Sequence, residues 1–83
     1  FMIEKQVREL IEGPIQEMGI TVDCVEYVKE GSNYFLRITI DRVQPIDVDT
    51  CVEVTHVVNP ILDKADIIKD SYILDISSKE KGD

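Results

Sequence analysis

The groups that most enzymes use for catalysis or metal binding are scarce in this sequence. Its 83 residues include one histidine, His56, two cysteines, Cys24 and Cys51, and no tryptophan. A zinc site needs about four Cys, His or carboxylate ligands at recognisable spacing. His56 follows Cys51 on a predicted helix at about 140° around its axis, so the two cannot share an ion or pair as nucleophile and base. We therefore expect no metal, no cofactor and no enzymatic activity, with His56 at the surface and both thiols buried.

Glycine-rich loops and excess positive charge, which favour nucleic-acid binding, are also missing. The four glycines lie at positions 13, 19, 31 and 82, so there is neither a Gly-x-Gly-x-x-Gly loop nor the Gly-x-x-Gly loop of KH-type domains. Nine basic residues stand against seventeen acidic ones, and the net charge is −8. Such a chain has little affinity for free nucleic acid and attracts cationic partners instead.

Long apolar segments are absent as well. No run of about 18 apolar residues could span a membrane, and residues 1–5 lack the apolar core of a signal peptide. Phe1 before Met2 is typical of a cloning remnant ahead of a natural start. Two cysteines are too few for a disulfide framework. We expect a cytoplasmic protein with reduced thiols.

The residues that are present predict two helices. Apolar side chains recur every three or four positions between residues 3 and 18, the pattern of an amphipathic helix. Gly13-Pro14 interrupts the pattern, so we expect a kink or break there, and Gly19 should end the helix. A second helix begins after Asp47, the predicted N-cap, and Pro60 should distort its last turn or end it near Asn59. Its predicted buried stripe consists of Val48, Cys51, Val54, Thr55, Val58 and Leu62.

Three strands are predicted between and after these helices. In the first, the apolar alternation shifts from even to odd positions near Cys24-Val25, which indicates a bulge. A polar turn over residues 29–33, with Gly31 and Asn33 available for positive φ, joins it to a cleanly alternating second strand in a hairpin. The predicted strands are residues 20–28, 34–41 and 72–77, and residues 79–83 form a polar tail.

The order of these elements predicts an α+β fold with the sequence α-β-β-α-β. The economical arrangement is one three-stranded sheet with both helices packed on one face. A right-handed crossover through the second helix makes strands two and three parallel. They are either neighbours or flank strand one, and the pattern does not choose between these orders. Because nothing specifies self-association, we expect a monomer.

Acidic residues gather at the start of the second helix. Asp47, Asp49 and Glu53 lie within its first two turns. One interpretation is structural, because negative charge there caps the helix and complements its dipole. The other is that these three residues form a partner-binding surface.

Particular segments resemble the N-terminal domain of the bacterial ribosome maturation factor RimP family. The resemblance covers residues 3–78 and depends on the order and spacing of several pieces rather than on any single motif. These pieces are Pro14-Ile15, Met18-Gly19, the hairpin segments Asp23 to Gly31 and Leu36 to Asp41, the helical segments Asp49 to Thr55 and Pro60 to Asp63, and the strand Tyr72 to Ser78. The family's usual Pro-Gly pair and Asp-Arg-Pro segment after this strand are replaced by Lys79 to Asp83.

The resemblance implies a RimP-like domain over residues 1–78 without the family's second, SH3-like barrel domain. It further implies a non-enzymatic assembly factor that binds the small (30S) ribosomal subunit, through a basic ribosomal protein, during maturation. We expect either an excised domain or a short divergent member. The alternative is a regulatory or ligand-binding α+β module severed from an intracellular enzyme. A catalytic domain encoded downstream would favour that alternative, whereas a short β-barrel would favour the assembly factor.

Overall fold

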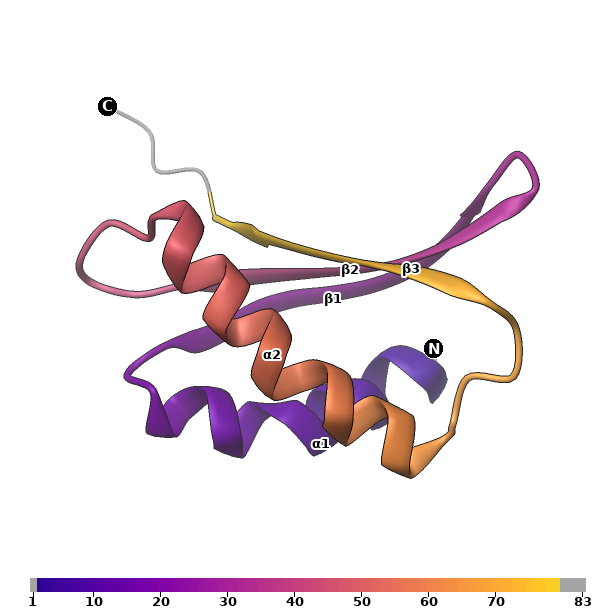
Figure 1. Ribbon diagram of the computed structural model, residues 1–83, viewed down its shortest axis with the longest axis horizontal. Helices are drawn as coiled ribbons and strands as arrows, with labels where there is room; N and C mark the ends of the chain where they lie inside the picture. The colour runs from indigo at the N-terminus through magenta and orange to yellow at the C-terminus, as the bar shows by residue number, and fades with distance from the viewer. Residues whose placement is uncertain (1, 80–83) are drawn as a thin grey trace.

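The computed structural model describes residues 2–79, in which two helices and three strands follow the predicted order α-β-β-α-β. The elements are α1 (Met2–Glu17), β1 (Thr21–Glu30), β2 (Asn33–Asp41), α2 (Val48–Ala65) and β3 (Tyr72–Ser78). Both helices lie on the same side of the sheet (Figure 1). This confirms the expected α+β fold. The expected tail lies outside the described residues apart from Lys79.

Helix α1 is continuous across Pro14, so a break at Gly13-Pro14 does not occur. Proline removes one backbone hydrogen bond and crowds the Cβ of the preceding residue, but Gly13 has no Cβ. Ile11 and Ile15, on either side of the pair, are fully buried and hold the helix in place. As predicted, Gly19 ends the helix, with φ 79°. Its N–H bonds the Gln16 carbonyl at 2.9 Å, and the Ile20 N–H bonds that of Ile15 at 3.3 Å, the Schellman pattern.

Strands β1 and β2 form the predicted hairpin with a bulge. The register runs from Thr21↔Asp41 to Glu30↔Asn33 and shifts between Val22 and Cys24, so Asp23 is the extra residue. The connecting turn is shorter than expected, since only Gly31 and Ser32 separate the paired ends. Gly31 has φ 63°, and neither Ser32 nor Asn33 has a positive φ. A positive φ at the first of the two central residues alone fits a II′ turn with glycine at that position.

Helix α2 begins at its predicted N-cap and runs further than expected. Asp47 is extended, with φ −96° and ψ 177°, and its side chain accepts a hydrogen bond from the Thr50 N–H. The helix continues through Pro60 to Ala65 and ends at Asp66, which is left-handed with φ 49°. The expected end near Asn59 is therefore wrong. Of the predicted stripe, Val54, Val58 and Leu62 are buried, whereas Val48 is exposed.

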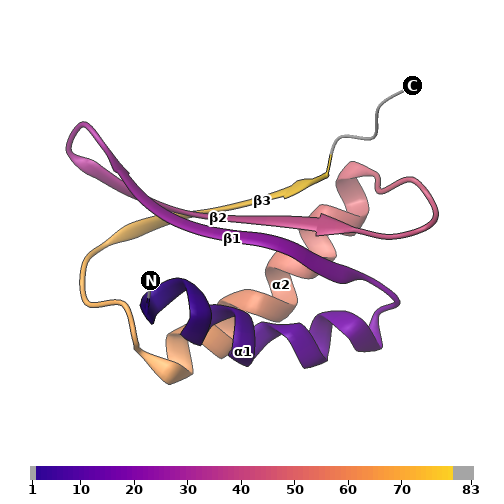
Figure 2. The same cartoon turned by 180° about the vertical axis from the view of Figure 1, so that it is seen from behind.

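The sheet has the order β1-β2-β3, with β2 in the centre. Strand β2 is antiparallel to β1 and parallel to β3, so the second and third strands are neighbours, the order that the sequence left open. In Figure 1 and Figure 2, which view the molecule from the front and from behind, both helices lie below the sheet, and no helix among residues 2–79 covers its upper face. No helix among residues 2–79 has the length and apolar character to cross a membrane.

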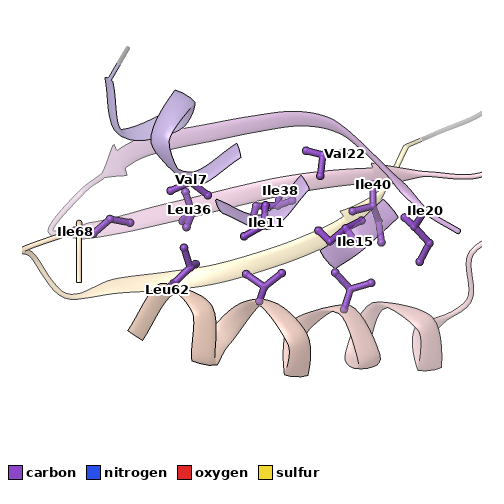
Figure 3. Close-up of a cluster of buried hydrophobic side chains, with 12 residues drawn as sticks. Val7, Ile11, Ile15, Ile20, Val22, Leu36, Ile38, Ile40, Leu62 and Ile68 are labelled. Carbon is purple, nitrogen blue, oxygen red and sulfur yellow. The ribbon is translucent and has the colours of Figure 1, made fainter. Parts of the chain in front are cut away.

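The hydrophobic core fills the space between the sheet and the two helices (Figure 3). Alternate residues of β2 point into it, so Leu36, Ile38 and Ile40 are fully buried. The other buried residues are Val7, Ile11, Ile15, Ile20, Val22, Val54, Val58, Leu62 and Ile68. Cys24 and Cys51 are free thiols of intermediate burial, so the expectation that both are buried is wrong.

Candidate docking surface at the start of the second helix

The first predicted site residue, Asp47, is occupied by its role in the helix. Its Oδ1 accepts hydrogen bonds from the Thr50 N–H at 2.8 Å and from the Thr50 hydroxyl at 2.7 Å. These bonds stabilise the charged carboxylate and lower the pKa of Asp47, the side-chain bond contributing most. Asp47 therefore caps α2, and one of its two carboxylate oxygens is occupied by Thr50.

The loop before α2 is organised by Arg42. Its guanidinium donates to the Pro45 carbonyl at 2.7 Å and to the Gln44 carbonyl at 3.2 Å. It also reaches the Thr50 hydroxyl at 3.5 Å, and its positive charge contributes to the lowered pKa of Asp47. Arg42 thus holds the loop against the helix start and fixes the direction in which the first turn of α2 projects.

The other two predicted site residues, Asp49 and Glu53, are exposed and one helical turn apart. Among residues 2–79, neither carboxylate forms a hydrogen bond or an ion pair with the protein. Asp49 lies in the first turn, where its charge complements the helix dipole. Glu53 lies beyond that turn, so the dipole does not account for it. These two carboxylates are therefore available to a partner, unlike that of Asp47.

Two exposed valines lie beside these carboxylates on α2, and the sequence pattern did not reveal them. Val43 in the preceding loop is 98% exposed, and Val48 and Val52 in α2 are 77% and 48% exposed. The predicted buried stripe includes Val48, but this residue lies about 120° around the axis from Val54, at the margin of the stripe. The four-residue spacing of Val48 and Val52 was the available signal. Val48, Asp49, Val52 and Glu53 together are called the α2 start surface below.

The groups that could perform chemistry are not gathered at this surface. His56 is exposed on α2, as predicted, and Cys51 faces the core at intermediate burial. Within residues 2–79, no group of three or more His, Cys, Asp or Glu side chains is arranged to hold a metal ion. What the α2 start surface offers is uncompensated negative charge beside apolar area, which suits the docking of another protein.

The fold is that of a small α+β domain with two helices and a three-stranded sheet. Residues 10–79 match the family described as the RimP N-terminal domain. Because the match covers most of the chain, the chain belongs to this family, whose members are ribosome maturation factors. The match confirms the resemblance found in the sequence, and it includes the bulged hairpin, the whole of α2 and β3.

Proposed function

We propose that this domain assists maturation of the small (30S) ribosomal subunit by binding a basic ribosomal protein through the α2 start surface. It acts in the cytoplasm as a monomer and without catalysis, and residues 1–78 are its functional unit. The family membership supports a role in ribosome maturation. The observation that carries the choice of surface is the pair of unpartnered carboxylates, Asp49 and Glu53, beside two exposed valines of the same helix, Val48 and Val52.

The net charge of −8 supports a cationic protein as the partner. A field of this sign steers positively charged surfaces toward the domain and repels the phosphate backbone of RNA. The valines add an apolar centre, which long-range charge alone lacks and which slows dissociation once contact is made. We therefore expect weak affinity for free nucleic acid and measurable affinity for small subunits or for their basic proteins.

The test reverses the two free carboxylates and leaves the helix cap intact. Asp49→Lys/Glu53→Lys should weaken binding to purified small subunits or basic ribosomal proteins by about tenfold, mainly through slower association. The matched control is Glu9→Lys/Glu17→Lys, which makes the same change in net charge at exposed positions of α1. Surface plasmon resonance at low and physiological salt measures both rates, and circular dichroism verifies folding.

Equal effects of the two double variants would show that only the total charge matters and would move the site away from α2. Absence of binding by the unmodified chain at low salt would contradict the proposed partner itself. Replacing Val48 and Val52 with serine should raise the dissociation rate more than it lowers the association rate, because the apolar contact forms after the encounter.

A further inference from the structure

The two outer edges of the sheet differ in how their backbone groups are used. At the β1 edge, the Glu4 carboxylate accepts the Tyr27 N–H at 3.0 Å. Arg8 donates to the Val22 carbonyl at 2.8 Å and to the Asp23 carbonyl at 3.4 Å. Side chains of α1 thus occupy this edge, and the bulge at Asp23 distorts it further. Both devices prevent the pairing of another strand.

The β3 edge lacks such protection. The Lys79 N–H donates to the Ile40 carbonyl of β2 at 2.8 Å, so the backbone groups of Lys79 point toward β2. This contact shows which residues of β3 direct their backbone groups toward β2 and which direct them toward the free edge. Since backbone groups alternate along a strand, the N–H and C=O groups of Tyr72, Leu74 and Ile76 point to the free edge. Within residues 2–79, no hydrogen bond satisfies them, and Tyr72–Ser78 contains neither proline nor lysine. An exposed edge of this kind is a template for an added strand.

A groove runs beside this edge, between β3 and α2. It has a volume of about 500 Å³ and is lined by Thr55, Asn59, Asp63, Asp70, Ser71, Tyr72 and Leu74. Its charged lining residues, Asp63 and Asp70, are both acidic, and the lysines close in sequence, Lys64 and Lys69, do not line it. Burial raises the pKa of the Tyr72 hydroxyl, and the negative charge of Asp63 raises it further. The groove is therefore an electronegative depression along the open edge.

We propose that β3 accepts an extended basic segment of a partner protein as a fourth strand, with Lys or Arg side chains lying in the groove toward Asp63 and Asp70. Side chains of neighbouring strands point to the same face, so alternate residues of an added strand lie over the groove beside Tyr72 and Leu74. Backbone bonds would supply affinity and the groove would select positive charge. A second copy of this chain is disfavoured, because each copy carries a net charge of −8 and the same acidic groove.

This inference rests on the proposed function for the nature of the partner, a basic protein. It does not depend on the proposed docking site, because the β3 edge is separate from the α2 start surface. The probe is a blocked peptide of about ten residues in which arginine alternates with valine or threonine. Amide chemical shifts and hydrogen exchange of the full chain are followed by NMR during titration. We expect shifts centred on β3 and slower exchange of the Tyr72, Leu74 and Ile76 amides on binding.

Two N-methylated forms of the peptide serve as matched probes. In one form the backbone N–H groups of the arginines are methylated, and in the other those of the intervening residues are methylated, so that these groups cannot donate hydrogen bonds. Strand addition requires only one set of peptide N–H groups, so one form should bind about tenfold more weakly while the other keeps its affinity. Loss on blocking the arginines indicates antiparallel addition, and loss on blocking the other set indicates parallel addition. Equal affinities of the two forms, or no binding of the parent peptide, would overturn the proposal.

Protein variants separate this site from the α2 start surface. Asp63→Asn/Asp70→Asn should weaken peptide binding at least as much as the sensitive N-methylation, whereas Asp49→Asn/Glu53→Gln should leave it unchanged. The opposite pattern would overturn the β3 proposal and favour the α2 start surface. Displacement of the peptide from β3 by a single-stranded RNA of similar length would assign the edge to nucleic acid and overturn the choice of a basic protein.

Discussion

At the scale of single residues, Asp47 and Asp49 illustrate how similar side chains take different roles. Both are acidic and stand at the start of α2, but only Asp47 accepts hydrogen bonds from Thr50. The sequence predicted this cap, because an aspartate directly before an apolar-periodic segment is a strong N-cap signal. It did not predict the exposure of Val48. Periodicity shows which face of a helix is apolar, but it does not show how much of the length of that face is covered by the rest of the protein.

Replacing Asp47 with alanine should lower the free energy of unfolding at neutral pH. The folded state lowers the pKa of Asp47 below its ordinary value of 3.8. Its stabilising contribution is therefore present above the unfolded pKa and is lost as pH falls through the folded pKa. The gap in stability between the two proteins should be largest near pH 7 and should shrink as pH falls below about 4.

Urea denaturation of both proteins across this pH range measures the gap. Asp47→Asn is the matched control, because asparagine caps helices about as well as aspartate but does not titrate. It should stay close to the unmodified chain at neutral pH. A gap for Asp47→Ala that is constant with pH would show that the carboxylate charge contributes nothing to the cap.

At the scale of elements, both helices tolerate a proline in their interior. Pro14 lies in α1 and Pro60 in α2, and each helix continues past it. The predicted break at Gly13-Pro14 and the predicted helix end near Asn59 were wrong because a local penalty competes with packing. Ile11 and Ile15 flank Pro14, Val58 and Leu62 flank Pro60, and all four are buried against the sheet. Where a stripe of such residues continues beyond a proline, tertiary contacts retain the helix.

The proline in α1 therefore carries a cost that substitution should relieve. Pro14→Ala restores an N–H that can bond the Leu10 carbonyl, and it should raise the free energy of unfolding by about 1–2 kcal/mol after the gain in unfolded-chain entropy is subtracted. Thermal and urea denaturation measure the change. Pro45→Ala is the control, because Pro45 lies in a loop and its replacement restores no helical bond. If Pro14→Ala is neutral or destabilising, the proline fits the helix without cost.

At the scale of the whole molecule, the sequence determined the layers but not the strand order. Alternation in β2 and the apolar stripes of both helices predicted one sheet with helices on one face. Placing β2 between its neighbours depends on contacts between distant segments, which no local pattern encodes. One usable signal was the size of the inward-facing residues of β2. In this strand alone, three successive inward positions carry large aliphatic side chains, as a central strand requires: Leu36, Ile38 and Ile40. The uneven protection of the two sheet edges could not be predicted either, because Glu4 and Arg8 act across the fold.

The net charge of −8 should give stability and binding opposite responses to salt. In a small folded domain, like charges lie closer together than in the unfolded chain, so their repulsion opposes folding. Raising sodium chloride from about 0.01 M to 0.5 M shortens the screening distance from about 30 Å to a few ångströms. The urea midpoint should therefore rise, whereas association with a basic ribosomal protein should slow.

The double variant Asp49→Lys/Glu53→Lys tests whether the salt dependence of the urea midpoint and of the association rate comes from the charge of the protein or from a general effect of salt on water. It reduces the excess of negative charge without touching the core or the Asp47 cap, so both salt dependences should become shallower in it. A general salting-out effect would raise the midpoint of the variant and of the unmodified chain equally. Parallel midpoint curves, together with association rates that do not depend on salt, would mean that the acidity of this domain governs neither its stability nor its encounter with the partner.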